Sequence, residues 1–280
     1  MLSYQHAYHA GGPADVIKHI LWAQLVAHLA ASPKPLNVFE THAGRGTYPV
    51  NTPEIRKLAE YRHGLGRLLA ELPTYPAIPA TAYLRMVHQT MQGAALTSIP
   101  GSPAIAAALA TPNTTLHLCE AHPGEMQHLR EALRAQAHTH FHAADGHKQI
   151  PALIRPGQRN LVLIDPSYEV KTEYAQTVQT VDAIVRKAPQ TTVMVWYPLL
   201  PGNRHQPLVD GLKALGVQAT QLVHYSWNPQ GAPGMHGTGQ IILNTPYRVE
   251  ETWQPVLREI APVLAQGANQ LTQAWLVPRR

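Results

Sequence analysis

The chain has 280 residues, of which 45% are hydrophobic and only 14% charged, with a formal net charge of +5 and 17 histidines. Low charge at an ordinary apolar content argues against a disordered chain, and the length suits one domain with a sizeable insertion. The single cysteine, Cys119, excludes an internal disulfide and Cys-rich zinc sites, and the absence of a signal-peptide pattern or a membrane-length apolar run predicts a cytoplasmic protein.

The first part of the chain mixes one clear strand with several helical segments. Pro13 suits a first helical position, and apolar residues then recur at three- and four-residue spacing as far as Ala31. Residues 36–40 form a short apolar strand. Three further helices are predicted, over residues 53–71, 80–92 and 103–110.

From residue 114 onward, strands and helices alternate regularly. The predicted strands cover residues 114–119, 139–143, 160–164 and 192–197, with a helix after each, and a closing hairpin follows at 218–225 and 239–243. A helix over 251–264 and a strand over 271–277 complete the pattern. Such alternation predicts an α/β fold with a parallel sheet and helices on both faces, whose ligands bind at the carboxyl ends of the strands.

A glycine-containing loop, Gly44-Arg45-Gly46, directly follows the first strand, and glycines there let the backbone approach a ligand. The third glycine of the dinucleotide fingerprint is replaced by Pro49, which disfavours an NAD oxidoreductase. The acid that would bind ribose hydroxyls is Glu120, since Glu60 lies inside a helical pattern. Residues 49–100 are then an inserted helical subdomain. The alternative is that Glu120 is a surface acid.

Two further strand ends carry candidate residues. Asp145-Gly146 can cap the next helix, accept from an adenine amino group, or do both. Asp165-Pro166-Ser167-Tyr168 provides a carboxylate, a proline-fixed carbonyl and an aromatic ring, which are groups that can hold and stack on an adenine whose amine is methylated. The alternative for this tetrapeptide is a plain turn. Asn244-Thr245-Pro246-Tyr247 looks similar but is interpreted as a turn of an edge hairpin.

Tyrosine, histidine and lysine gather before residue 20. In an extended segment Tyr4, His6 and Tyr8 would share one face, and Lys18 and His19 lie one turn into the first helix. These residues either form a solvated surface or a strap over an active site. His140 and His142 would share one face of a strand, but no clustered carboxylate or cysteine completes a site. We therefore predict no metal and solvent-facing histidines.

Several motifs together resemble a known family. They are the opening Met1-Leu2-Ser3-Tyr4-Gln5-His6-Ala7-Tyr8-His9-Ala10-Gly11, then Ala14-Asp15-Val16-Ile17-Lys18-His19, Thr41-His42-Ala43-Gly44, Pro100-Gly101-Ser102-Pro103, Glu120-x-His122-Pro123, Ala144-Asp145-Gly146, Asp165-Pro166-x-Tyr168-Glu169, Trp196-Tyr197-Pro198 and Gly234-Met235. In this order they resemble the RlmJ family of bacterial 23S rRNA adenine-N6 methyltransferases over essentially the whole chain.

The resemblance implies a Rossmann-like class I S-adenosylmethionine-dependent methyltransferase domain, formed by residues 1–48 and 101–280, with an N-terminal strap over 1–12 and an inserted helical subdomain over 49–100. It implies a catalytic Asp165 and a base-binding set of Tyr4, His6, Pro166 and Tyr168. It implies S-adenosylmethionine contacts from Lys18, His19, His42, Gly44, Ser102, Glu120, Asp145, Gly146 and Asp165.

The expected function is N6-methylation of one adenine in 23S rRNA, by a monomer acting on naked or early-assembly RNA away from membranes. The alternatives are a DNA adenine-N6 methyltransferase and a non-catalytic nucleic-acid-binding or DNA-utilisation protein. The chain departs from the family pattern at two places. Ser167 stands where the family usually has a second proline, and Gly12-Pro13 replaces an Asn-His pair.

Overall fold

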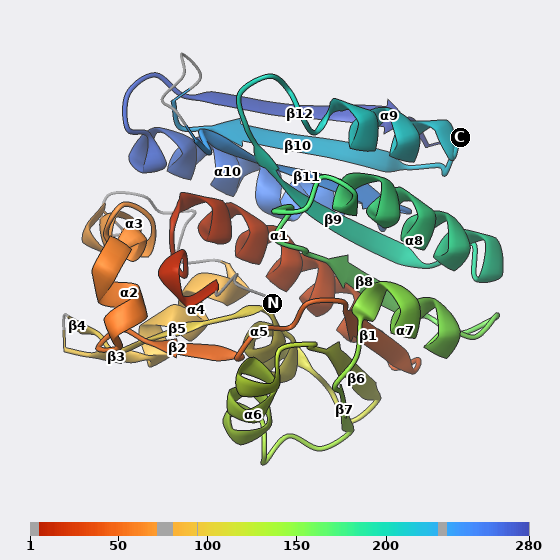
Figure 1. Ribbon diagram of the computed structural model, residues 1–280, viewed down its shortest axis with the longest axis horizontal. Helices are drawn as coiled ribbons and strands as arrows, with labels where there is room; N and C mark the ends of the chain where they lie inside the picture. Colours follow the sequence, from red (N-terminus) through yellow and green to blue (C-terminus); the bar gives the residue numbers. More distant parts are fainter. Residues whose placement is uncertain (1–5, 72–80, 94, 229–233, 280) are drawn as a thin grey trace.

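The computed structural model describes residues 6–71, 81–93, 95–228 and 234–279. Its centre is a twisted sheet that has eight strands in these residues, in the order β12-β10-β11-β9-β8-β1-β6-β7 (Figure 1). Within the run β9-β8-β1-β6-β7, every pair of adjacent strands is parallel. This is the order of a Rossmann-like sheet, in which the chain reverses direction across the sheet at β1 and β8.

The strands of the parallel part lie close to their predicted positions. Their bounds are β1 Leu36–Glu40, β6 Thr114–Cys119, β7 Thr139–His142, β8 Asn160–Ile164 and β9 Thr192–Leu199. The helices between them are α5 Ser102–Leu109, α6 Pro123–Ala132, α7 Gly146–Leu153 and α8 Glu173–Lys187, and α9 Gln206–Ala214 follows β9. The sequence pattern therefore predicted this region correctly, to within a few residues at the helix ends.

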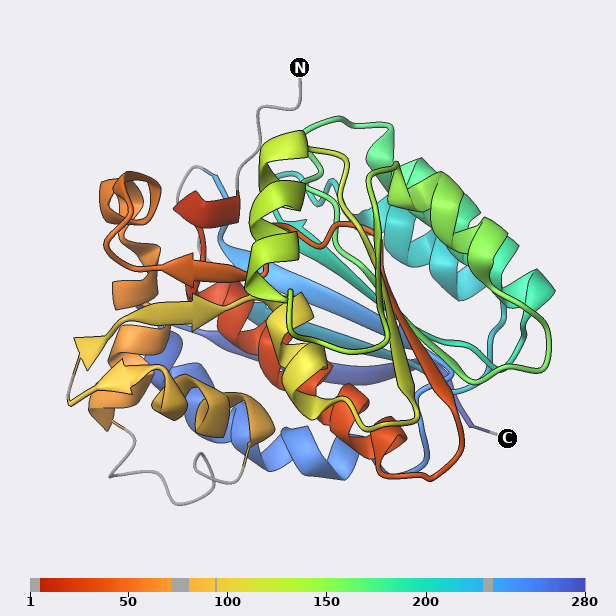
Figure 2. The ribbon, with the colours of Figure 1, turned by 90° about the horizontal axis from the view of Figure 1, so that it is seen from below.

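Helices cover both faces of the sheet and bury two apolar clusters. One cluster joins the sheet to α1 (Pro13–Ala30), α5, α6 and α10 (Glu250–Leu264), and the other joins it to α7, α8 and α9. Figure 2 shows α8 and α9 side by side on the face opposite α1. Helix α1 is buried on nearly every side, which explains why its sequence lacks a strong polar face.

The segment between β1 and α5 is more broken than predicted. The expected helix over 53–71 is divided into α2 Pro53–Leu58, the 3₁₀ turn η2 Glu60–Arg62 and α3 Leu65–Glu71. Ala59 ends α2 in the left-handed region at φ 50°, and an added Cβ at Gly64 would lie 2.1 Å from the carbonyl oxygen of Gly11. The chain bends here because it packs directly against the N-terminal segment.

The rest of this segment combines one helix with short strands. The helix expected over 80–92 is α4 Ala82–Gln89, capped by the hydroxyl of Thr81, and the strands are β2 Thr47–Pro49, β3 Met91–Gln92, β4 Ala95–Leu96 and β5 Ser98–Pro100. Buried side chains of α3 and α4 join the same apolar cluster as α1. The segment is thus packed into the main core on the side of α1.

The C-terminal strands correct one expectation. β10 (Thr220–Ser226) and β11 (Gly237–Leu243) form the predicted antiparallel pair, but β11 also pairs with β9 and lies inside the sheet. The edge is β12 (Gln270–Val277), which pairs with β10. The turn predicted at Asn244 is present, although it does not belong to an edge hairpin. No helix among the described residues is long and apolar enough to cross a membrane.

Candidate active site

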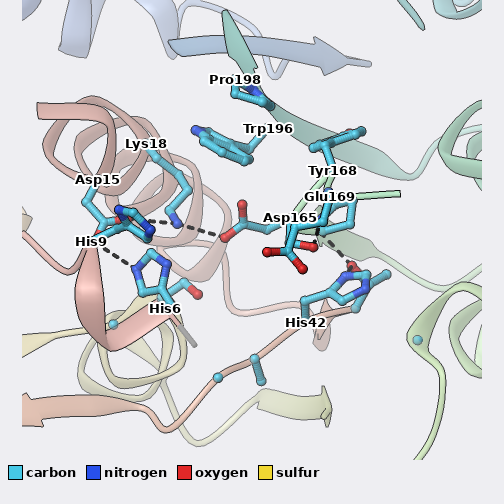
Figure 3. A pocket seen from close by; sticks show the side chains of 18 of the residues that line it. His6, His9, Asp15, Lys18, His42, Asp165, Tyr168, Glu169, Trp196 and Pro198 are labelled. Carbon is cyan, nitrogen blue, oxygen red and sulfur yellow. Dashed lines mark hydrogen bonds and ion pairs between the residues drawn. The ribbon is translucent and has the colours of Figure 1, made fainter. Parts of the chain in front are cut away.

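A cavity of about 660 Å³ opens at the carboxyl ends of the parallel strands (Figure 3). Its walls come from α1, the loops after β1, β6, β7 and β8, and the first turn of α5. The volume lies in the range of sites for small molecules and cofactors. The cavity therefore lies where the sheet topology predicts a ligand.

The structure brings the predicted site residues together in this cavity. Those that line it are Lys18, His19, His42, Gly44, Ser102, Glu120, Asp145, Gly146 and Asp165, together with His6, Pro166 and Tyr168. Tyr4 lies outside the described residues. The individual roles of these residues remain predictions.

The glycine loop is held in a tight conformation beside Glu120. Gly44 has φ +62°, and an added Cβ would lie 2.5 Å from the hydroxyl oxygen of Tyr48. The Glu120 carboxylate accepts the backbone N–H of Gly44 at 2.9 Å and that of His122 at 2.7 Å. Burial raises the pKa of Glu120, and these two N–H donors oppose the rise. Glu120 is thus a fixed acceptor on the cavity wall and not a free surface acid.

A buried ion pair supports the same loop from below. Arg45 donates two hydrogen bonds to the carboxylate of Glu125 in α6, at 2.9 and 2.6 Å. Both side chains are at most one-tenth exposed. Because a bidentate pair fixes the direction as well as the distance, it sets the loop relative to α6.

Asp145 and Gly146 bring the start of α7 close to β1. Asp145 caps the helix by accepting the backbone N–H of His147 at 2.9 Å, so the predicted cap is confirmed. An added Cβ at Gly146 would lie 2.2 Å from the carbonyl oxygen of Thr41. Only glycine therefore fits at this contact. The Asp145 side chain also lines the cavity, and the cap uses only one of its two carboxylate oxygens.

The Asp165 loop follows the fully buried strand β8. Lys18 donates a hydrogen bond to Asp165 at 2.7 Å. Burial raises the pKa of Asp165, while the nearby charges of Lys18 and His6 oppose the rise. Tyr168 has φ +54°, a rare conformation for a residue with a side chain, and its ring stacks on that of Tyr174 at 4.5 Å. Strain of this kind is held in place by surrounding contacts and is common at functional sites.

Asp15 is a central residue that sequence reasoning assigned no role. Its carboxylate accepts from the Lys18 ammonium at 3.0 Å, from His6 at 2.9 Å and from the backbone N–H of Gly11 at 3.0 Å. Burial by itself would raise the pKa of Asp15, but the positive groups around it hold the value well below its usual range. Burial by itself would lower the pKa of Lys18. The carboxylates of Asp15 and Asp165 outweigh this effect and raise the pKa above its usual value.

Two expectations about the N-terminal region are wrong. Lys18 and His19 do not form a solvated surface, because they are only 3% and 1% exposed. Residues 6–8 are not extended but form the 3₁₀ turn η1 (His6–Tyr8), which directs His6 toward Asp15 (Figure 3). Tyr8 is outside the cavity lining and lies under Lys57 instead. Hydrogen bonds from His6 and from the backbone N–H of Gly11 to the buried Asp15 hold this compact segment in place.

Ser102 reaches a second buried acid. Its hydroxyl donates to Glu40 at the end of β1, at 2.6 Å, and the indole N–H of Trp22 donates to its backbone carbonyl at 3.2 Å. Glu40 is fully buried, and burial raises its pKa to about 8. These contacts fix the first turn of α5 against β1 and α1, so that Ser102 faces the cavity.

Histidines are divided between the cavity and the sheet. His42 bonds to the hydroxyl of Thr41 at 2.8 Å, and burial lowers its pKa. On the outer strands, His117 stacks between Phe39 and His140, at 4.7 and 4.9 Å. Among the described residues, no group of three or more His, Cys, Asp or Glu side chains could hold a metal ion.

The cavity also has an aromatic roof that sequence reasoning noted only as a landmark. Trp196 and Pro198, on β9, line the cavity above Lys18 and Asp165 (Figure 3). The Trp196 indole N–H donates to Thr238 at 2.7 Å, and the Lys18 ammonium lies 5.7 Å from its ring centroid. The Trp-Tyr-Pro motif at a strand end was the available signal for this role.

Comparison with known proteins identifies the family. The family model described as ribosomal RNA large subunit methyltransferase D, RlmJ, matches residues 33–277. The chain therefore belongs to the RlmJ family. Ribosomal RNA large subunit methyltransferase J from Escherichia coli (strain K12) is 30% identical, over 99% of this chain and 100% of that protein. The protein of the same name from Haemophilus influenzae is also 30% identical, with the same coverage.

A solved structure has the same fold over nearly the whole chain. The crystal structure of a Legionella pneumophila protein has a TM-score of 0.88 and 29% identity, and the match covers 95% of this chain and 98% of that one. Together with the strand order, membership of the RlmJ family confirms the predicted Rossmann-like methyltransferase fold, with S-adenosylmethionine as the cofactor. The resemblance inferred from the motifs is also confirmed.

Proposed function

We propose that this protein methylates N6 of one adenine in 23S rRNA. The observation that carries the proposal is the Asp165-Pro166-Ser167-Tyr168 loop, which opens from the end of β8 into the cavity. An adenine amine is a poor nucleophile because its lone pair is delocalised into the ring. A carboxylate and a backbone carbonyl that accept its two N–H hydrogens can orient it, and an aromatic side chain can stack on the base.

The residues of the cavity fit S-adenosylmethionine. Gly44 and Gly146 are places where a side chain would not fit, so the backbone closes tightly around the adjoining space. Glu120, held by two backbone N–H groups, suits ribose hydroxyls, and Asp145 suits an adenine amino group. Lys18, His19, His42 and Ser102 would complete the contacts. When bound, this cofactor supplies a methyl group on a positively charged sulfur.

Asp165 would hold the target amine and accept its proton. For this the carboxylate must be ionised, and burial opposes ionisation. Lys18, at 2.7 Å, favours the ionised form, and Asp15 holds Lys18 in place from the other side at 3.0 Å. We assign Asp15 as a positioning residue and Asp165 as the catalytic residue.

The two segments around the cavity have distinct proposed tasks. The strap over 1–12, tied to Asp15 through His6, would close over the target base with Tyr4. The segment over 49–100 would act as an inserted helical subdomain, whose Glu60 meets His9 of the strap at 2.9 Å. We further propose that the enzyme works in the cytoplasm as a monomer on naked or early-assembly RNA.

Replacing the catalytic carboxylate tests the function. Asp165→Ala should abolish methylation of in vitro transcribed 23S rRNA, measured as N6-methyladenosine by mass spectrometry of the digested RNA. Calorimetric binding of S-adenosylmethionine should persist, because other residues supply most of the proposed cofactor contacts. Near-normal turnover by this variant would refute the assignment. If the native enzyme methylated duplex DNA in preference to rRNA, the proposal that 23S rRNA is the substrate would be refuted.

A further inference from the structure

The charge of the main cavity poses a problem for RNA binding. Among the residues that the structure describes, eight carboxylate side chains line it, against one lysine, Lys18, which is already held between Asp15 and Asp165. A phosphate backbone carries one negative charge per nucleotide and depends on Lys and Arg for affinity. The cavity can therefore accept an uncharged base, but the flanking phosphates need cations outside it.

A second hollow of about 620 Å³ lies between α8 and α9, beside the catalytic loop. Its floor is largely apolar and includes Ala175, Val178 and Pro207. Lys171 and Arg204 line it as well, at the turns that follow β8 and β9. Both turns are at the carboxyl edge of the sheet, which is the edge where the main cavity opens.

The first turns of α8 separate the two hollows. Glu173 and Gln176 line the main cavity, whereas Tyr174 and Val178 line the α8–α9 groove. Tyr174 stacks at 4.5 Å on Tyr168, the residue proposed to stack on the target base. An α-helix with its side chains is about 10–12 Å across, so the groove lies about one helix diameter from the cavity.

The two cations of the groove are available for a ligand. Lys171 and Arg204 are exposed, and within the described ranges neither makes a hydrogen bond or an ion pair. Two other lysines of the described structure have partners, since Lys148 lies 3.6 Å from Asp145 and Lys57 lies over the ring of Tyr8.

Tyr174 adds an independent sign of a ligand. The residue is only 8% exposed, and its buried hydroxyl has no hydrogen-bond partner in the described structure. Buried polar groups normally have a partner, and one that lacks it calls for an explanation. A polar ligand in the groove that this residue lines would supply the missing contact.

We propose that the groove between α8 and α9 binds the RNA strand next to the target adenine. Lys171 and Arg204 contact its phosphates, and the apolar floor and Tyr174 take up a neighbouring base. This inference rests on the proposed function, because it assumes that the adenine in the cavity belongs to an RNA chain. It assigns affinity for RNA to a surface separate from the residues that perform the chemistry.

Matched double variants test the groove. The groove variant is Lys171→Gln/Arg204→Gln. The control is Lys34→Gln/Arg258→Gln, which removes the same charge from exposed positions, one before the amino end of β1 and one on α10. Binding of a short fluorescein-labelled oligoadenylate is followed by anisotropy over a range of salt concentrations. Losing two phosphate contacts should reduce the slope of log affinity against log salt by about 1.4 and weaken binding roughly tenfold or more at 0.1 M salt.

Turnover gives a second readout. With 23S rRNA transcripts, the groove variant should have a KM raised roughly tenfold, with little change in kcat and an unchanged calorimetric affinity for S-adenosylmethionine. If the groove variant matches the control in salt slope and KM, the groove proposal is wrong. If the groove variant loses slope relative to the control but the native enzyme methylates no rRNA transcript, the proposed function is wrong, and the groove is an RNA-binding surface without the assigned target.

Discussion

The ion pair between Lys18 and Asp165 should set the pH at which the enzyme becomes active. Lys18→Met removes the cation and keeps a similar length of side chain. At 2.7 Å and an effective dielectric constant of about 20, the Coulomb attraction is roughly 6 kcal/mol, an upper bound because Asp15 shares the ammonium. A neighbouring opposite charge typically lowers a carboxyl pKa by about 1–3 units. Losing Lys18 should raise the pKa of Asp165 by about that amount.

The assay is kcat/KM for rRNA as a function of pH at saturating S-adenosylmethionine. Since Asp165 must be ionised, the acidic limb of the profile should move up by about 1–3 pH units in Lys18→Met. Asp15→Asn should move it the other way, because the Asp15 charge raises the pKa of Asp165. Lys18→Arg keeps the charge and should leave the limb near its native position. Shifts of equal sign in Lys18→Met and Asp15→Asn would refute the reasoning.

Three other predictions follow from the geometry. Glu120→Gln leaves one acceptor oxygen for two N–H donors and should weaken S-adenosylmethionine binding roughly tenfold or more; an unchanged calorimetric affinity would contradict the ribose role. Gly146→Ala should lower the free energy of unfolding by about 1–3 kcal/mol, because the added Cβ would clash with the Thr41 carbonyl oxygen. An unchanged melting temperature in this variant would contradict the predicted clash. Burial lowers the pKa of His19 to about 3. Between about pH 6.5 and pH 3 the unfolded state therefore binds a proton that the folded state does not. The free energy of unfolding should fall by about 1.4 kcal/mol for each unit by which the pH is lowered in this range. Urea unfolding at several pH values should show this dependence, and His19→Gln should reduce it.

The elements that could be predicted from the sequence are those whose bounds depend on a few neighbouring residues. Strands β1, β6 and β8 have the predicted bounds because each is a short apolar run between turn or polar residues. The break at Ala59 was missed because a helical pattern continues across it, and the bend comes from packing of Gly64 on Gly11. The interior position of β11 was missed for a similar reason, since strand pairing is a long-range property.

The site residues also divide into those that local sequence patterns predict and those that depend on long-range packing. Gly44, Glu120, Asp145 and Asp165 follow strands, and the topology rule for α/β sheets is enough to bring strand ends together. Asp15 had no such signal, because an acid in the first turn of a helix is ordinarily a solvated residue that favours the helix dipole. Its importance comes from the burial of α1 on nearly every side, and that burial depends on helices far along the chain, such as α10.

Ser167, where the motif resemblance predicts a second proline, shows how distant contacts can replace a local constraint. A proline would restrict the backbone of the loop directly. Here Ser167 offers only a long hydrogen bond, from the backbone N–H of Glu169 at 3.5 Å. The loop is fixed from outside, by Lys18, which is 147 residues away in sequence from Asp165, and by the stacking of Tyr168 on α8. The contact with Lys18 also favours the ionised form of Asp165, and the stacking of Tyr168 on Tyr174 joins the cavity to the proposed RNA groove. The geometry of the loop and the chemistry of the site therefore depend on the same long-range packing.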